Sequence, residues 1–454
     1  MTNPVLQDLL QKARTAQAQY AAFTQEQVDA IVRAIAKVVY DNAEALAKMA
    51  VDETRMGVYE HKVAKNKGKS KVIWNDLKDK RSIGILRHLE EEGLIEVAKP
   101  MGVIGAVAPT TNPTVTAMSN AMFALKGGNA IIIAPHPRAK NVSRVTVEMM
   151  NDALRPLGAP EHLIQIITEP SIELTNDLMQ AVDVIIATGG GAMVKAAYSS
   201  GRPAYGVGPG NVQCIMDRGI DYADAVPKII YGRAFDNGII CSGEQSVIAP
   251  AEDLDTILDL FRQNGAYIVD TEEEKEKLVG TLFEGGMTAK DIVGQSAHRV
   301  GQLAGIPVPE TAKVIMAKAD GPGSADALSK EKMCPVLAVY GYDTFEDALT
   351  IAQTNLELEG KGHSCALHSH NDEHIRQAGL ALTVSRLVLN QPSSTTAGGS
   401  LQNGFAPTTT LGCGTWGNNI ISENFTYKHM INISRIGYYL KDKPVPTDDD
   451  IWAE

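Results

Sequence analysis

Cysteine is scarce in this sequence, and the five that occur stand far apart. They lie at positions 214, 241, 334, 365 and 413, without any C-x-x-C pair. An odd number of widely spaced cysteines indicates neither a disulfide framework nor a zinc site.

Long apolar runs are also missing. None reaches the roughly eighteen residues that a membrane-spanning helix needs. The N-terminus passes directly into an amphipathic pattern with Leu6, Leu9 and Leu10, and it lacks the basic start and continuous apolar core of a secretion signal. We therefore expect a cytoplasmic protein without a membrane partner.

Positive charge is in short supply, since the net charge is −12. This balance argues against nucleic acid as the main partner. Residues 62–81 are a local exception, because lysine and arginine greatly outnumber aspartate there. The segment is either the solvated face of a helix or a surface that attracts an anionic substrate or cofactor.

The chain is long enough, at 454 residues, for two or three domains that each have a core. Residues 5–80 show helical periodicity, and Thr24 with Gln27 forms a plausible capping box. Two β-rich segments, 82–86 and 93–98, are spaced as a hairpin.

Short apolar runs then alternate with helix-length intervals, which indicates βαβ units and a buried parallel sheet. Such a sheet binds ligands at the carboxyl ends of its strands. The expected strands are residues 103–108, 130–134, 164–167 and 182–187, followed after residue 245 by a second α/β domain with strands near 245–249, 336–340, 364–368 and 386–390. Residues 391–418, rich in Gly, Ser, Thr and Asn, are expected to form a functional loop.

Cys241 stands between the turn-forming Asp236-Asn237-Gly238 and a Ser-Gly pair. Such flanks place it where backbone amides converge, rather than inside a periodic apolar face. That is a setting for a nucleophile. A buried structural thiol that packs as a small hydrophobe is the alternative.

Two further turns follow strands. Thr188, Gly189 and Gly190 precede a helical segment, where glycines and free amides suit a dinucleotide phosphate, although a simple tight turn has the same pattern. Asn112 lies in a Pro-flanked turn and offers an amide donor for an oxyanion site or an Asx turn. The glycine-rich residues 206–211 precede a strand, residues 212–216, and are not expected to bind phosphate.

These pieces, in their order and spacing, resemble the CoA-acylating branch of the aldehyde dehydrogenase superfamily, over nearly the whole chain. The resemblance implies an α/β protein with a Rossmann-type cofactor domain, an α/β catalytic domain and a small oligomerisation element. The segments that carry it are residues 109–113, 135–138, 187–190, 199–203, 236–245, 330–335 and 410–417.

The resemblance also implies roles. Cys241 attacks the carbonyl carbon, Asn112 and the Cys241 backbone amide hold the oxyanion, and Glu331 orients the nicotinamide ribose. His363 matches a histidine of the acylating branch that assists thiol deprotonation, with a structural hydrogen-bonding role as the alternative. The implied cofactor-binding residues are Thr110, Pro135, His136, Arg138, Thr188, Gly189, Gly190, Gly208, Glu331 and Pro335.

One departure from the hydrolytic members supports the acylating branch. Gly206 occupies the position where hydrolytic members carry the glutamate that activates water, so coenzyme A is expected as co-substrate. Within the branch, residues 57–60, the lysine-rich helix that follows them and residues 444–452 resemble acylating succinate-semialdehyde dehydrogenases. We expect succinyl-CoA reduction with NADPH, Arg138 accepting the 2′-phosphate, and Lys69 with Ser242 binding the distal carboxylate. Lys69 as mere surface charge is the alternative.

Two other functions remain open at this point. One is an acylating enzyme for acetyl-, propionyl- or butyryl-CoA that uses NADH, and the other is a catalytically silent scaffold. We expect no metal, no fused alcohol dehydrogenase domain and no N-terminal microcompartment helix. The expected division is a cofactor domain at 1–235, containing an oligomerisation hairpin at 82–98, a catalytic domain at 236–425 and an oligomerisation tail at 426–454, in a homodimer or dimer of dimers.

Overall fold

A computed structural model describes residues 3–453. Four helices open the chain, as expected: α1 (Pro4–Tyr20), α2 (Gln25–Asp41), α3 (Ala43–Thr54) and α4 (Tyr59–Leu77). The predicted capping box starts α2, where the Thr24 side chain accepts from the Gln27 backbone and the Gln27 side chain accepts in return from the Thr24 backbone. The apolar stripe of α2 is buried against the helices of the first sheet.

The first sheet has five parallel strands in the order β5-β4-β3-β6-β7. Its bounds are β3 (Val103–Val107), β4 (Ala130–Ala134), β5 (Ile164–Ile166), β6 (Val184–Thr188) and β7 (Ala204–Val207), with helices α5 (Pro113–Lys126), α6 (Lys140–Leu154), α7 (Ile172–Ala181) and α8 (Gly191–Tyr198) between them. The strand order reverses at β3, and the crevice beside β3 and β6 at their carboxyl ends is where such sheets bind ligands. The Rossmann-type arrangement is confirmed.

The second sheet has seven parallel strands in the order β10-β13-β14-β9-β8-β15-β16. One face packs on α9 (Tyr222–Ala234) and α10 (Leu254–Gln263), and the other on α11 (Glu272–Leu282), α12 (Ala297–Ala304), α13 (Phe345–Leu358) and α14 (Asp372–Ala381). The strands are β8 (Gln213–Met216), β9 (Ser246–Pro250), β10 (Ala266–Ile268), β13 (Val314–Lys318), β14 (Val336–Tyr342), β15 (Gly362–His368) and β16 (Val384–Leu389).

The change from one sheet to the other falls between β7 and β8. The expected division at residue 235 stays a prediction, and we propose that the boundary lies before residue 213, because β8 and α9 already pack in the second core.

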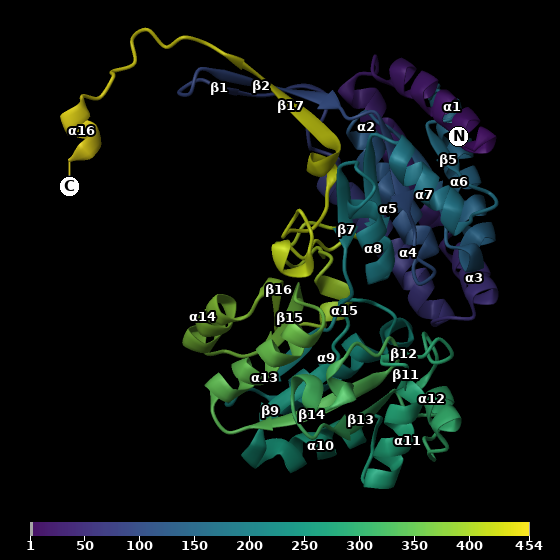
Figure 1. Cartoon of the computed structure of the whole chain (residues 1–454), viewed down its shortest axis with the longest axis vertical. Helices are drawn as coiled ribbons and strands as arrows, with labels where there is room; N and C mark the ends of the chain where they lie inside the picture. Colours follow the sequence, from purple (N-terminus) through teal and green to yellow (C-terminus); the bar gives the residue numbers. More distant parts are fainter. Residues whose placement is uncertain (1–2, 454) are drawn as a thin grey trace.

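A three-stranded antiparallel arm projects from the first body (Figure 1). The predicted hairpin is confirmed as β1 (Gly84–Leu89) paired with β2 (Leu94–Pro100), and β17 (Ile431–Gly437) adds to the other edge of β2. The chain then runs away from the arm to α16 (Asp448–Trp452).

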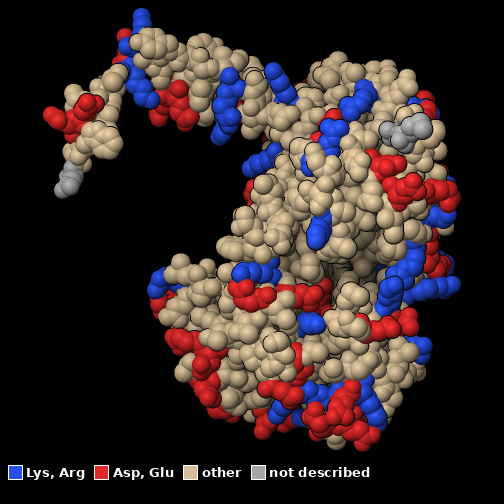
Figure 2. Space-filling model, viewed as in Figure 1, with Lys and Arg blue, Asp and Glu red and all other residues tan. Residues whose placement is uncertain are grey.

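Charge is unevenly spread over the face drawn in Figure 2. Acidic side chains gather over the body that holds the seven-stranded sheet, at its end away from the arm, with basic side chains among them. No continuous basic surface is visible on this face. Across residues 3–453, no helix is both long and apolar enough to cross a membrane.

Candidate active site

The segment that carries Cys241 begins with a strained turn. Helix α9 ends at Ala234, and Asp236 and Asn237 both adopt a φ of 54°. This left-handed conformation is one that Asp and Asn tolerate better than most residues. The turn therefore reverses the chain sharply, and Cys241 follows it four residues later, as the Asp-Asn-Gly pattern predicts.

Helix α4 holds this turn in place. The carboxylate of Asp236 is fully buried and accepts from the Val58 backbone at 2.8 Å and from Lys62 Nζ at 3.1 Å, and it also pairs with Lys65. The Asp236 backbone N–H donates to His61 Nδ1 at 2.9 Å. A charged cluster this well bonded fixes the nucleophile's turn relative to α4.

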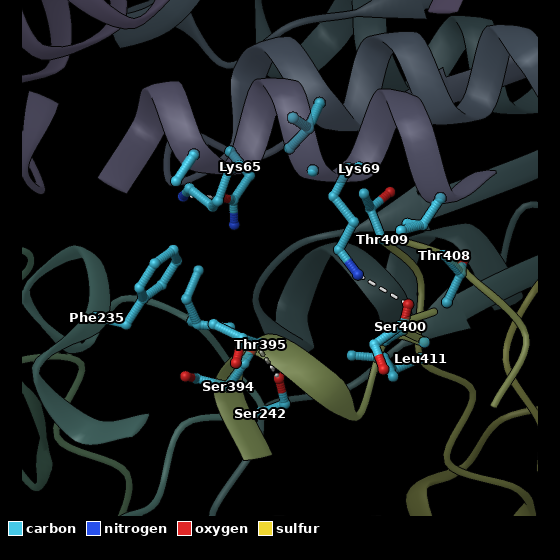
Figure 3. A pocket seen from close by; sticks show the side chains of 18 of the residues that line it. Lys65, Lys69, Phe235, Ser242, Ser394, Thr395, Ser400, Thr408, Thr409 and Leu411 are labelled. Carbon is cyan, nitrogen blue, oxygen red and sulfur yellow. Dashed lines mark hydrogen bonds between the residues drawn. The ribbon is translucent and has the colours of Figure 1, made fainter. Parts of the chain in front are cut away.

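Cys241 lies half-buried in the wall of a cavity of about 280 Å³. Figure 3 shows Lys65 and Lys69 reaching down into this cavity from one helix, with Ser242, Ser394 and Thr395 on the opposite side. The segments that carry Ser242 and Ser394 are joined to each other, because Glu244 Oε1 accepts from the Ser393 backbone at 2.6 Å. Ser400, Thr408 and Thr409 complete the lining, which is otherwise mostly apolar and includes Val72, Val115 and Leu411.

The surroundings of Cys241 favour the protonated form of its thiol. Burial raises its pKa to about 12, with further upward contributions from Glu331 and Cys413, while the Arg386 guanidinium lowers it. A structural thiol would pack away from open space, whereas this one borders the cavity. The nucleophile interpretation is the one that this position supports.

Lys69 lies inside the cavity, so the surface-charge interpretation is wrong. Burial lowers its pKa to about 8, opposed by attraction to Cys241. One of its N–H groups donates to the Gly398 carbonyl at 2.8 Å, the dashed line in Figure 3. A lysine ammonium has three donors, so two remain for a ligand.

Ser242 lines the same cavity, although its hydroxyl proton already forms a hydrogen bond within the protein. Its Oγ donates to the Ser394 carbonyl at 3.3 Å. In this rotamer it presents lone pairs rather than a proton to the cavity, which a carboxylate does not favour.

Asn112 stands at the end of the β3–α5 connection and faces the same cavity. Its side chain makes no capping bond to the backbone of α5, and its Oδ1 instead accepts from Lys65 Nζ. The Asx-turn alternative therefore fails, and the amide Nδ2 remains available as a donor.

The expected cofactor residues gather at the carboxyl ends of β3, β4 and β6. A Cβ at Gly190 would meet nothing within 4 Å, and one at Gly189 would meet only Met193 at 3.8 Å. The N-terminus of α8 carries no side-chain cap, so its amides are free for a phosphate. These features fit a dinucleotide, and Thr110, Pro135, His136, Arg138 and Thr188 lie along the same edge.

His136 and Arg138 differ in exposure. His136 is half-buried, and its Nδ1 accepts from the Arg138 backbone at 3.1 Å. Burial, and then the Arg138 charge, lower the pKa of His136. The Arg138 side chain is exposed beyond it, which leaves the guanidinium accessible to a phosphate.

Glu331, Pro335 and Gly208 do not line the cavity of Cys241 among the residues described. Glu331 is buried, and burial together with the Glu359 charge raises its pKa to about 8. The Glu331 charge also raises the pKa of the Cys241 thiol. Pro335 is buried in front of β14, and Gly208 is half-buried after β7.

His363 is likewise outside this cavity. It is fully buried on β15, and its Nδ1 is 3.1 Å from Ser364 Oγ. Burial, then the Arg386 charge, lower its pKa to about 3, so the ring is neutral and a weak base in this position. Its catalytic role stays a prediction.

The roles of Lys62, Lys65 and Asp236 were missed at the level of sequence, whereas Lys69 was predicted. Lys62, Lys65 and Lys69 share one face of α4 and point inward, whereas Lys71 is exposed. Their spacing of three and seven residues was the available signal. Asp236 was assigned only to the turn, and its pairing with two of these lysines was not foreseen.

Gly206 has little room for a side chain. A Cβ there would lie 2.6 Å from Val194 Cγ1 and 2.8 Å from Tyr198 Cε2. Val194 and Tyr198 would have to shift to admit a side chain, so their present positions disfavour a glutamate here. Among residues 3–453, no group of three or more His, Cys, Asp or Glu side chains is placed to hold a metal ion.

Known proteins resemble this chain along its length. The aldehyde dehydrogenase family model matches residues 2–299. Succinate-semialdehyde dehydrogenase (acetylating) of Clostridium kluyveri is 58% identical over 454 residues, which covers 100% of both chains. An acetylating aldehyde dehydrogenase from Geobacillus thermoglucosidasius has a crystal structure with a TM-score of 0.94 and 37% identity, covering 97% of this chain and 98% of that one.

A third similar protein was solved with a ligand. The propionaldehyde dehydrogenase of Rhodopseudomonas palustris, with bound propionyl-CoA, has a TM-score of 0.83 and 30% identity, covering 95% of this chain and 94% of that one. Because the family match spans more than half of the sequence and these relatives align along nearly all of it, the chain belongs to the aldehyde dehydrogenase family and, within it, to the CoA-acylating branch.

Proposed function

We propose that the protein interconverts succinyl-CoA and succinate semialdehyde with NADPH, through a thioester on Cys241. The observation that carries this proposal is the placement of Cys241 and the Lys69 ammonium in one cavity of about 280 Å³. That volume suits a short acyl chain, and the cation suits an acyl chain that ends in a carboxylate. The close similarity to the Clostridium kluyveri enzyme supports the same substrate.

Acyl transfer begins at the Cys241 sulfur. As Sγ bonds to the carbonyl carbon, the bond to the coenzyme A sulfur breaks, and the Cys241 proton goes to the departing thiolate. Because the reactant and the product of this step are both thioesters, the transfer has little free-energy cost. The carbonyl oxygen gains negative charge during the attack, and Asn112 Nδ2 with the Cys241 backbone amide supplies the donors that stabilise it.

The nicotinamide, when bound, supplies the hydride that reduces the thioester. The chain's own residues then let the tetrahedral adduct collapse: the carbon–sulfur bond breaks, the aldehyde leaves, and Cys241 takes up a proton again. Arg386 lowers the pKa of Cys241 and so favours sulfur as the leaving group in this step.

Coenzyme A, rather than water, accepts the acyl group in the oxidative direction. Gly206 supports this, because Val194 and Tyr198 in their present positions disfavour a water-activating carboxylate there. We expect His363, a buried neutral histidine, to assist deprotonation of the incoming thiol.

The NADPH preference rests on Arg138. Its exposed guanidinium follows β4 at the carboxyl edge of the first sheet, where the adenosine ribose binds in folds of this type. A guanidinium donates two parallel hydrogen bonds to a phosphate, so Arg138 would stabilise a bound 2′-phosphate more than a 2′-hydroxyl.

The second candidate is the same chemistry on acetyl-, propionyl- or butyryl-CoA with NADH. The propionyl-CoA complex of a similar protein favours this alternative. Initial rates with acetyl-, propionyl-, butyryl- and succinyl-CoA, each measured with NADPH and NADH, separate the two. A higher kcat/KM for succinyl-CoA with NADPH supports the proposal, and a higher value for butyryl-CoA with NADH refutes it.

We also propose that the protein is a homodimer or a dimer of dimers. The arm and tail expose large apolar side chains, including Tyr438 at 61%, Tyr439 at 91% and Trp452 at 80%. Apolar groups this exposed on a projecting segment fit burial against a second copy. Sedimentation equilibrium of the full chain tests this, and a monomer at micromolar concentration would contradict it.

A further inference from the structure

The amide of Asn112 has a partner that its proposed role does not explain. Lys65, on α4, donates from its Nζ to Asn112 Oδ1. A lysine ammonium has donors only, so the Asn112 atom that faces it must be the oxygen. The NH₂ group of Asn112 is thereby directed away from Lys65.

Lys65 is itself firmly held. Its side chain is 10% exposed, and it pairs with the Asp236 carboxylate, which is 0% exposed. Lys62 binds the same carboxylate at 3.1 Å and donates to the Thr111 carbonyl at 3.3 Å. The segment that carries Asn112 is thus bound at two consecutive residues by two lysines of one helix.

The same cluster connects the turn that leads to Cys241 with the segment that carries Asn112. Asp236 belongs to the turn that leads to Cys241, and Asn112 belongs to the β3–α5 connection. Lys65 contacts both, so its ammonium bridges the nucleophile's turn and the amide. Two lysines with one carboxylate leave a net positive charge behind Asn112.

We propose that Lys65 is a positioning residue for the oxyanion donor. It locks the Asn112 amide with Nδ2 toward the reacting carbonyl oxygen, and its charge polarises the amide so that Nδ2 donates more strongly to an oxygen that gains negative charge. This inference rests on the proposed function, since it assumes that Asn112 serves the carbonyl attacked by Cys241.

The competing explanation is that Lys65 serves only to attach α4 to the turn. A tether of that kind would act on Cys241 and on stability, with no dependence on the Asn112 side chain. The two explanations make different predictions for a protein that lacks the Asn112 amide. Removing Lys65 has little further effect if Lys65 acts through Asn112, and it keeps its full effect if Lys65 is only a tether.

A double-mutant cycle tests this on the full-length protein, with succinyl-CoA and NADPH as the substrates. The variants are Lys65→Met, Asn112→Ala and the double substitution, and Lys71→Met is the control because it removes an exposed lysine from the same helix. We expect Asn112→Ala to lower kcat by about 10²- to 10³-fold. Lys65→Met should lower it by about 10- to 150-fold, the factor typical of one charge-assisted hydrogen bond.

The double variant decides the question. We expect its kcat to lie within about threefold of that of Asn112→Ala, because Lys65 has no amide left to orient. The KM for succinyl-CoA should change little in Lys65→Met, and Lys65→Arg, which keeps a charged donor, should recover part of kcat. If the two losses multiply instead, Lys65 does not act through Asn112 and the inference fails.

Folding and the proposed function are controlled separately. If Lys65→Met does not fold, judged by its thermal transition, the cycle is repeated with Lys65→Ala, which also removes the donor. Mass spectrometry of the unmodified protein after succinyl-CoA exposure should find the succinyl group on Cys241. With that adduct present, multiplying losses overturn the inference alone. Absence of both adduct and turnover overturns the proposed function and this inference together.

Discussion

Replacing Lys69 with methionine should separate the effect of its charge from the effect of its size on substrate binding in the cavity of Cys241. Methionine keeps a chain of similar length and removes the ammonium, which has two N–H groups left after its bond to Gly398. A succinyl carboxylate that enters the cavity loses hydration, and Lys69 is the cation placed to offset that loss.

The size of the effect follows from one charge-assisted hydrogen bond. Such a bond contributes roughly 1.5–3 kcal/mol, which corresponds to about 10- to 150-fold in kcat/KM at roughly 1.4 kcal/mol per factor of ten. Lys69→Met should lower kcat/KM for succinyl-CoA by this factor and leave butyryl-CoA unchanged or improved. Ser242→Ala should have a smaller effect, because its hydroxyl donates to Ser394.

The assay is a comparison of initial rates for the two acyl-CoA substrates under identical conditions. Lys71→Met, on the exposed side of the same helix, controls for the loss of one positive charge from α4. An equal loss with succinyl-CoA and butyryl-CoA would refute the reasoning. The lysine would then be structural or bind another part of coenzyme A, and Arg386 or residues 391–400 would be the next candidates for the carboxylate partner.

Four further outcomes are expected. Cys241→Ala should abolish turnover and the mass-spectrometric acyl adduct while nucleotide binding persists, and an adduct on Cys413 instead would contradict the assignment. Arg138→Ser should shift the ratio of NADPH to NADH efficiency toward NADH by about tenfold or more, the worth of one charge-assisted contact, and an unchanged ratio would exclude this residue as the determinant. Without coenzyme A, aldehyde oxidation should stop after one cofactor equivalent per site, because Gly206 provides no base, and sustained acid production would be evidence against this. The preference for succinyl-CoA over butyryl-CoA should fall between pH 7 and 9, since burial lowers the pKa of Lys69 to about 8 and its charge is lost as the pH rises through that value; a preference that stays constant would show that Lys69 does not provide it.

Much of the fold could be predicted because the patterns are local. The opening helices occupy the residues whose helical periodicity predicts them, and each strand of the first sheet up to residue 188 was expected within two residues. The short β10 and β13 were missed. Strand β10 has only three residues, too few to show a pattern. Strand β17 was missed because its partner β2 lies far away in the chain.

The site could be predicted less completely. The turn before Cys241 is encoded by neighbouring residues, so it was predictable. Which of the lysines of residues 62–81 turn inward depends on how α4 packs on the rest of the molecule, and this rotation is a tertiary property. The bond that occupies the Ser242 proton and the closeness of Val194 and Tyr198 to Gly206 likewise arise only when distant segments meet.

The pairing of β17 with β2 has a consequence for how the chain is made. Asn432 bonds to Pro100 across a separation of 332 residues. At roughly 5–20 residues per second, a ribosome needs about 20 to 60 seconds to reach β17 after it has finished β2. During that interval the hairpin of β1 and β2 has a bare edge that can pair with other chains. Synthesis of the last twenty-odd residues therefore completes the arm and ends the period in which its edge is exposed to aggregation. A ribosome that stalls before residue 431 holds a nascent chain whose β2 edge is still unpaired.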